Sequence, residues 1–290
     1  MTGVALVHPP RHQVLAIIQR ALDEDIGAGD VTTDNAVPPE QRSRAVLLAK
    51  QAGVLCGGQV FAETLTLVDR DIEVNLLMAD GAPLIPGTEV ARIEGPTRGL
   101  LTAERTALNF VQRLSGIATT TAAFVARLRG LPAKLVDTRK TTPGLRVLEK
   151  YAVRVGGGYN HRFNLADAVL LKDNHLAALR QRGLDLAAAV RSVRDRVPHT
   201  MRVEVEVTSL EQIDAVLAGG ADVVLLDNMT TEAMREAVRR IGGQALTECS
   251  GTVTLETVRE RAETGVDLIS SGALTHSAKA LDLSLELVDE

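Results

Sequence analysis

The chain's strongest constraint on its fold is a unit repeated between residues 133 and 273, in which a short apolar run precedes a helical pattern. Each run is rich in Val, Leu and Ile and ends in polar residues, as buried strands do. The six runs are AKLVDTRK (133–140), DAVLLKDNH (167–175), RVEVEVTS (202–209), ADVVLLDNM (221–229), ALTECSGT (245–252) and VDLISSGA (266–273). Repeated strand–helix units predict a parallel sheet, and six of them at this spacing favour an α/β barrel over an open sheet.

The first third of the chain has a different pattern. A helix is predicted over 14–26, a loop rich in turn formers over 27–40, and strand-like segments over 43–58, 71–87 and 88–95. Gly-Ala-Pro and Pro-Gly, both within the segment 71–87, suggest hairpins. A long amphipathic helix is predicted over 100–130. The final segment, 276–290, is expected to pack back on this N-terminal domain.

Composition excludes several classes of protein. Aromatic residues make up 2% of the chain, with no Trp, and the net charge is −5, so we expect no nucleic-acid partner. No apolar stretch is long enough to span a membrane, and the N-terminus lacks the pattern of a signal peptide. Cys56 and Cys249 have no metal-ligand spacing, so free thiols and a cytoplasmic location are expected.

Residues 137–175 form a positive segment in this acidic chain, with seven Lys or Arg against four Asp or Glu. Several of these cations stand at the ends of predicted strands, where the active sites of α/β barrels lie. Arg139, His161, Arg162 and Lys172 together are suited to a ligand with two carboxylates. Surface ion pairs at strand ends are the alternative interpretation of the same residues.

Later strands end in carboxylates and small residues. Glu206 and Asp227 end neighbouring strands, where they could bind Mg²⁺, stabilise a developing cation, or simply pair with Lys140 or Lys172. Glu204 shares a strand side with Glu206 and could contribute as well. The turns at 249–252 and 270–275 follow the last two strands, where backbone N–H groups often bind phosphate.

These residues lie within motifs that resemble those of the quinolinate phosphoribosyltransferase family along nearly the whole chain. The motifs are EDIGAGDVTT (24–33), LTAERTALNFVQRLSGIAT (101–119), DTRKTTPGLRVLEKYAVRVGGGYNHRFNL (137–165), LLKDNH (170–175), VEVEV (203–207), LLDNM (225–229) and SGALTHS (271–277). The resemblance implies an N-terminal α/β sandwich domain over 1–115, joined by 276–290. It also implies an incomplete α/β barrel of the type II phosphoribosyltransferase kind over 116–275.

The activity implied by the resemblance is transfer of 5-phosphoribosyl from its 1-diphosphate to quinolinate, with loss of CO₂, in de novo NAD biosynthesis. The implied assembly is a homodimer in which Arg105 is supplied to the partner's site. Residues matching the dicarboxylate site are Arg139, His161, Arg162 and Lys172. Residues matching the phosphoribosyl diphosphate and Mg²⁺ site are Lys140, Glu206 and Asp227, with Thr138 in the same substrate-binding motif as Lys140. The 5-phosphate site matches Ser250, Gly251, Thr252, Ser271, Gly272 and Ala273.

One residue departs from the family pattern. The family commonly has two glycines after the serine of the first phosphate turn, whereas this chain has Gly251 followed by Thr252. If the second glycine requires a positive φ, Thr252 would fit poorly.

Three other functions are compatible with parts of the pattern. The first is a related barrel that acts on another aromatic acid, against which the complete set of dicarboxylate residues argues. The second is an aldolase-type barrel with a Schiff-base lysine at Lys140 or Lys172. The third is a non-catalytic sensor of phosphorylated ligands, which would not need the acidic strand ends.

Overall fold

A computed structural model describes residues 6–288, and the chain divides into two compact units. The sheet unit comprises the chain up to residue 122, residues 141–157 and the chain from residue 274. The barrel unit comprises residues 123–140 and 158–273. The division expected from the sequence, at residue 115, thus differs from these units chiefly in the position of residues 141–157.

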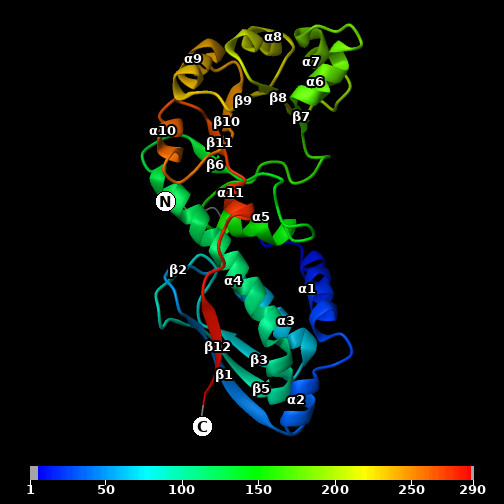
Figure 1. Ribbon diagram of the computed structural model, residues 1–290, viewed down its shortest axis with the longest axis vertical. Helices are drawn as coiled ribbons and strands as arrows, with labels where there is room; N and C mark the ends of the chain where they lie inside the picture. The colour runs from blue at the N-terminus through cyan, green and yellow to red at the C-terminus, as the bar shows by residue number, and fades with distance from the viewer. Residues whose placement is uncertain (1–5, 289–290) are drawn as a thin grey trace. The chain divides into compact units, whose positions relative to one another are not determined.

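The sheet unit is built on a four-stranded antiparallel sheet with the order β12-β1-β5-β3 (Figure 1). Its strands are β1 (Arg42–Ala49), β3 (Glu73–Leu76), β5 (Glu89–Pro96) and β12 (Leu283–Val288). β12 pairs with β1, so the last strand of the chain completes the first sheet. Two short strands, β2 (Gly53–Val54) and β4 (Pro83–Leu84), pair separately.

The expected segments form strands, and segments adjacent in the chain pair antiparallel as the turn signals suggested, although the pairs are interleaved. β3 pairs with β5, and β4, which lies between them in the chain, pairs with β2. Turn signals identify where the chain reverses, whereas the choice of partner depends on which apolar faces meet across the sheet.

In the described part of the sheet unit the longer helices are α1 (Arg11–Ile26), α2 (Val31–Ala36), α3 (Gly58–Val68), the first part of α4 (Thr97–Arg127) and α5 (Arg146–Val155). The predictions for α1 and α4 are confirmed. The predicted loop at 27–40 instead contains α2, which begins where the Asp30 carboxylate accepts a hydrogen bond from the Thr33 N–H at 2.9 Å. Helix α3 was not predicted.

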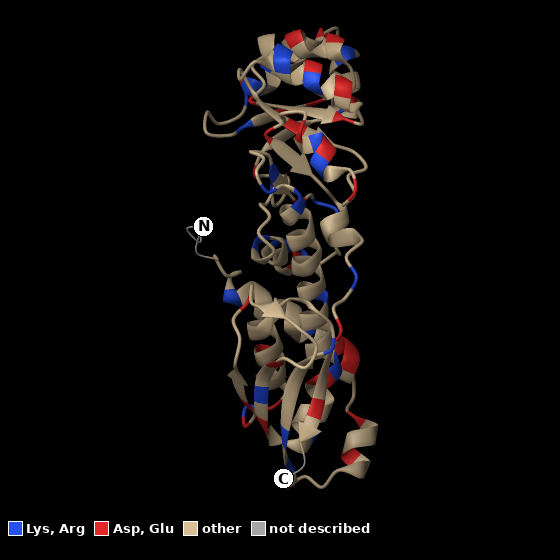
Figure 2. Ribbon diagram, turned by 90° about the vertical axis from the view of Figure 1, so that its left-hand side faces the viewer, with Lys and Arg blue, Asp and Glu red and all other residues tan. Residues whose placement is uncertain are grey.

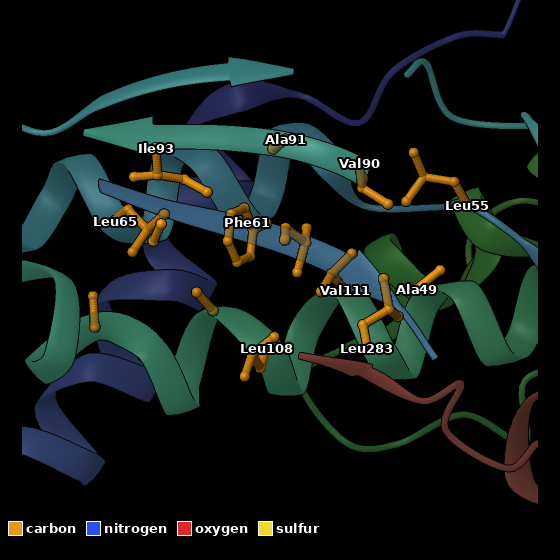
Figure 3. Packing of buried hydrophobic residues seen from close by; sticks show 14 of the residues in the cluster. Ala49, Leu55, Phe61, Leu65, Val90, Ala91, Ile93, Leu108, Val111 and Leu283 are labelled. Atoms are coloured by element: carbon orange, nitrogen blue, oxygen red, sulfur yellow. The ribbon is translucent and has the colours of Figure 1, made fainter. Parts of the chain in front are cut away.

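The core of the sheet unit is apolar and closely filled. Figure 3 shows Phe61 of α3 between the β5 side chains and α4, with Leu108 and Val111 on the facing side of α4. Phe61 and Val111 are fully buried. Burial of these side chains is the main source of stability for this sheet, because α3 and α4 cover one face of it.

The barrel unit contains a six-stranded sheet in the order β6-β11-β10-β9-β8-β7, with all neighbours parallel. Its strands are β6 (Lys134–Val136), β7 (Val169–Leu171), β8 (Val203–Val207), β9 (Val223–Asp227), β10 (Leu246–Ser250) and β11 (Leu268–Ser270). β6 and β7 are the two ends of the sheet, so the barrel is incomplete. The predicted combination of an N-terminal α/β domain with an incomplete barrel is confirmed.

Helices connect successive strands on the outside of this sheet (Figure 1). They are α6 (Asp173–Arg180), α7 (Leu186–Arg194), the 3₁₀ turn η1 (Leu210–Gln212) with α8 (Ile213–Ala218), α9 (Thr231–Ile241), α10 (Val258–Ala262) and α11 (Ala273–His276), which leads into the last segment of the sheet unit. Lys or Arg and Asp or Glu alternate along the outer helices (Figure 2). In the part of the chain that the structure describes, no helix combines the length and apolar character needed to cross a bilayer.

Candidate active site

The residues predicted to form the site follow or end the parallel strands of the barrel unit. The strands β6, β7 and β11 are followed by site residues: Thr138, Arg139 and Lys140 after β6, Lys172 after β7, and Ser271, Gly272 and Ala273 after β11. The other three strands carry site residues near or at their ends: Glu206 in β8, Asp227 in β9 and Ser250 in β10. Because the strands are parallel, all of these positions lie at one edge of the sheet, which we call the rim. In barrels of this class, that edge carries the active site.

Two guanidinium groups of the predicted site interact as like charges. Partial burial and then the positive charge of Arg139 lower the pKa of Arg162, while Glu204 and Asp167 oppose this shift. Arg162 also donates a hydrogen bond from Nη1 to the Ala168 carbonyl at 3.0 Å. Two cations held near each other at a partly buried site favour the binding of an anion, which relieves their repulsion.

Two carboxylates of the rim interact as like charges. The pKa of Glu206 is raised, first by burial and then by the charge of Asp227, while Lys172 acts in the opposite direction. Both carboxylates are partly exposed. A divalent cation would relieve this repulsion, and Mg²⁺ prefers one or two carboxylates together with water and phosphate oxygens, so the donor set fits Mg²⁺.

The segment that carries His161 and Arg162 is fixed by a buried carboxylate. Asp137, fully buried at the end of β6, accepts hydrogen bonds from the His161 N–H at 2.9 Å and from Asn160 Nδ2 at 2.6 Å. Tyr159 forms an isolated parallel bridge with Val136. The sequence analysis did not predict this role of Asp137. Its position was a usable signal, because an acidic residue that directly follows the apolar run 133–136 stands at the end of a buried strand.

Below the rim, the barrel unit contains a cavity of about 360 Å³. Its charged lining residues include His161, Arg162, Glu204 and Glu248. Burial and the neighbouring Glu204 raise the pKa of Glu248 from its ordinary value of 4.5 to about 7, while His161 opposes the shift. The sequence analysis named Glu204 as a possible site residue but did not name Glu248. Glu248 could have been identified as a charged residue in the middle of the predicted strand 245–252.

The turn at 249–252 adopts a conformation that threonine tolerates. Gly251 has a φ of +119°, whereas among the described residues Asn228 is the only non-glycine with a positive φ. A Cβ atom at position 251 would lie 2.4 Å from Asn228 Oδ1. The left-handed position is therefore Gly251, and Thr252 departs from the family pattern without backbone strain.

Arg105 lies on α4 within the sheet unit, where its side chain is exposed. Nearby on the same helix, the side chains of Thr102 and Thr106 donate hydrogen bonds to Asp30 and Asp25. The two aspartates belong to the 24–33 motif, so this motif packs beside the helix that carries Arg105.

Comparisons with known proteins agree with this arrangement. The quinolinate phosphoribosyl transferase family matches in two parts: its N-terminal domain at residues 30–115 and its C-terminal domain at residues 117–286. The chain therefore belongs to the quinolinate phosphoribosyltransferase family.

Individual relatives cover almost the whole chain. A nicotinate-nucleotide pyrophosphorylase [carboxylating] from Mycobacterium leprae is 45% identical over 279 residues, which are 93% of this chain and 95% of the relative. A probable enzyme of the same name from Bacillus subtilis is 42% identical, over 95% of this chain and 93% of its own length. The crystal structure of NadC from Streptococcus pyogenes matches with a TM-score of 0.91 and 43% identity, covering 98% of this chain and 100% of that one.

Proposed function

We propose that this protein is a phosphoribosyltransferase of de novo NAD biosynthesis that acts on quinolinate. It transfers 5-phosphoribosyl from phosphoribosyl diphosphate to the pyridine nitrogen and releases diphosphate and CO₂, so that nicotinate mononucleotide is formed. The observation that supports this most is the charge of the site. Two guanidiniums, of Arg139 and Arg162, interact as like charges, and two carboxylates at the ends of neighbouring parallel strands do the same. The names of the relatives agree with the same reaction.

Arg139 and Arg162, with Lys172, supply the charge that a dicarboxylate requires. A guanidinium binds a carboxylate through two parallel hydrogen bonds, which fixes the direction of the ring as well as its position. The pyridine nitrogen is already a nucleophile, so these residues need only bind quinolinate and orient it toward the sugar.

Displacement at the anomeric carbon develops positive charge on the sugar ring. Glu206 and Asp227 are suited to stabilise this charge, and Lys140 is suited to balance the charge of the departing diphosphate. We propose Mg²⁺ as the metal held by Glu206 and Asp227; when bound, it neutralises the diphosphate oxygens. The phosphate turns at 250–252 and 271–273 would hold the 5-phosphate through backbone N–H groups.

Decarboxylation follows from the charge of the alkylated ring. Once the nitrogen carries the sugar, the bond between C2 and its carboxylate breaks, and CO₂ leaves. The electron pair stays on C2, beside the positively charged nitrogen, and C2 then takes up a proton. The protein's contribution to this step is to hold the ring in place.

The direct test is incubation of the purified protein with quinolinate, phosphoribosyl diphosphate and Mg²⁺. We expect nicotinate mononucleotide and CO₂ in equal amounts, and no product when nicotinate replaces quinolinate. Product from nicotinate, or none from quinolinate, would overturn the assignment. Trapping of a carbonyl substrate on Lys140 or Lys172 with borohydride would indicate an aldolase-type enzyme instead.

We further propose a homodimer in which Arg105 reaches the partner subunit's site. Neither Arg105→Ala nor Lys140→Ala should be active alone, but exchange of their subunits should restore activity, because one site of each mixed dimer has both residues intact. Mixing two preparations of Arg105→Ala is the control. If subunit exchange is verified and activity still does not return, the shared site is contradicted.

We also propose that the enzyme works in the cytoplasm. The thiols of Cys56 and Cys249 are free, which suits a reducing compartment.

A further inference from the structure

Three ionisable side chains lie together inside the barrel unit, deeper than the rim. The Nε2 atom of His161 lies 3.1 Å from Glu204 Oε2 and 3.6 Å from Glu248 Oε2. Both glutamates are more than nine-tenths buried, and among the described residues their Oε1 atoms have no hydrogen-bond partner. Buried carboxylates in this state reduce stability, so a functional reason for their position is needed.

The hydrogen bonds of His161 define which ring nitrogen carries the proton. The backbone N–H of Arg162 donates to His161 Nδ1 at 2.7 Å, so Nδ1 offers a lone pair and has no hydrogen. The hydrogen of the neutral ring is therefore on Nε2, from which it is donated to Glu204. Glu248, at 3.6 Å, lies beyond direct hydrogen-bond distance of the ring, and its strongest electrostatic coupling is to Glu204, which raises its pKa after burial does.

This tautomer argues against a metal ion at the three side chains, although their ligand atoms lie within 4.8 Å of one another. A metal would need the Nε2 lone pair, and that position holds the hydrogen. Binding would require both the loss of this hydrogen and the rupture of the bond from Arg162.

The same contacts link the glutamates to Arg162. Glu204 holds the imidazole, the imidazole holds the Arg162 backbone, and the Arg162 guanidinium is held in turn by the Ala168 carbonyl. Asp137 also fixes the His161 backbone, by accepting its N–H. The ring is thus held at both nitrogens and at its own main chain.

We infer that Glu204 and Glu248 are positioning residues: they hold His161 as the tautomer protonated at Nε2, and through it they set the position of the Arg162 guanidinium that binds the dicarboxylate. This inference rests on the proposed function for the identity of the ligand. It assigns to the buried pair a role in binding quinolinate that requires no contact with quinolinate itself.

The kinetic test compares variants of the pair. Glu204→Leu removes the acceptor of the imidazole hydrogen, so KM for quinolinate should rise on the order of tenfold. KM for phosphoribosyl diphosphate should change less than twofold, roughly, because its binding groups are elsewhere on the rim. Glu204→Gln keeps an acceptor oxygen and should restore most of the loss. Glu248→Gln should have a smaller effect than Glu204→Leu, since Glu248 is farther from the ring.

Glu63→Leu is the matched control. Glu63 is also a buried carboxylate, but it belongs to the sheet unit and pairs with Arg11. It should leave both KM values unchanged. An equal rise of both KM values in Glu204→Leu, or no rise in either, would overturn the inference.

The tautomer is tested independently of activity by NMR of the ¹⁵N-histidine-labelled wild-type protein near neutral pH. The signal of His161, assigned by its disappearance in His161→Gln, should show a hydrogen on Nε2 and a bare Nδ1. A hydrogen on Nδ1 would refute the inference even if quinolinate is the substrate. If quinolinate is not the substrate, wild-type protein fails the product assay while this spectrum still decides the geometry.

Discussion

The two units of this protein both have apolar cores, but their buried carboxylates differ in how they are paired. In the sheet unit, Phe61, Leu108 and Val111 lie in an apolar core in which side chains fill the space between helices and sheet (Figure 3). Its buried Glu63 and Glu149 each pair with an arginine. Glu204 and Glu248 of the barrel unit lie beside a cavity of about 360 Å³, and their Oε1 atoms have no hydrogen-bond partner among the described residues. An interior filled with apolar groups contributes stability, whereas buried charges lower it and are retained where they serve a site. Among the described residues, buried carboxylates with an unpartnered oxygen therefore occur only in the unit that carries the rim.

The largest effect on stability is expected from Phe61→Ala in the sheet unit. Phe61 is fully buried, so its truncation should lower the free energy of unfolding by about 3–5 kcal/mol. Chemical denaturation followed by circular dichroism measures the change. Leu287→Ala, at a half-exposed position of β12, is the control and should cost far less. A loss below about 1 kcal/mol for Phe61→Ala would mean that this core is not closely packed.

In the barrel unit, Arg162→Ala tests whether a side chain contributes to substrate binding without contributing to stability. It should lower kcat/KM for quinolinate about 100-fold or more, because loss of a charge-assisted contact costs about 2–5 kcal/mol. The melting temperature should change little. Arg202→Ala, which removes another arginine of the same cavity, is the control. Normal quinolinate kinetics in both Arg162→Ala and Arg139→Ala would contradict the placement of the dicarboxylate.

A smaller effect is expected at the first phosphate turn. Gly251→Ala should lower stability by about 1–3 kcal/mol, because position 251 has a positive φ and Asn228 fills the space of a Cβ. Its KM for phosphoribosyl diphosphate should also rise. Thr252→Gly should cost about 1 kcal/mol or less, through the entropy of the unfolded chain alone. Thermal and urea unfolding of the two variants decide this, and the reverse order of losses would place the strained position at 252.

The smallest expected effect is a pH dependence of stability caused by Glu248. Its folded pKa of about 7 lies above the ordinary 4.5, so its stabilising contribution is complete below pH 4.5 and is lost as the pH rises through 7. Glu248→Gln has no such titration and should gain stability relative to wild type over this range, by roughly 1 kcal/mol or more.

Urea unfolding at pH 5 and pH 8 measures this difference. Glu94→Gln, at an exposed carboxylate, is the control and should differ from wild type equally at both values. If Glu248→Gln also differs from wild type by the same amount at both pH values, the pKa of Glu248 is not raised by its burial.

The sequence predicted the barrel unit better than the sheet unit, and the reason is physical. Strands buried on both faces are continuous apolar runs, and their parallel order leaves little freedom in how they join. The antiparallel sheet depends on partners distant in the chain, such as β12 on β1, which no local pattern indicates. Short helix α2 was hidden among turn formers because its start depends on one cap, Asp30.

The site followed a similar rule. Residues at strand ends, such as Lys140 and Asp227, could be predicted because barrel geometry brings those ends together. Asp137 and Glu248 could not, since their roles depend on which side of a strand faces inward and on what lies opposite. Alternation along a strand gives two possible sides, and only the register of the sheet decides between them.

The pairing of β12 with β1 has a consequence for synthesis of the chain. The edge of β1 (Arg42–Ala49) receives its partner from residues 283–288, so the first sheet remains without its edge strand until nearly the whole chain has left the ribosome. An uncovered strand that carries buried residues such as Leu47 is a surface on which other nascent chains can pair. A stop codon that removed only the last eight residues would therefore leave every rim residue in place and still be expected to yield a protein that aggregates.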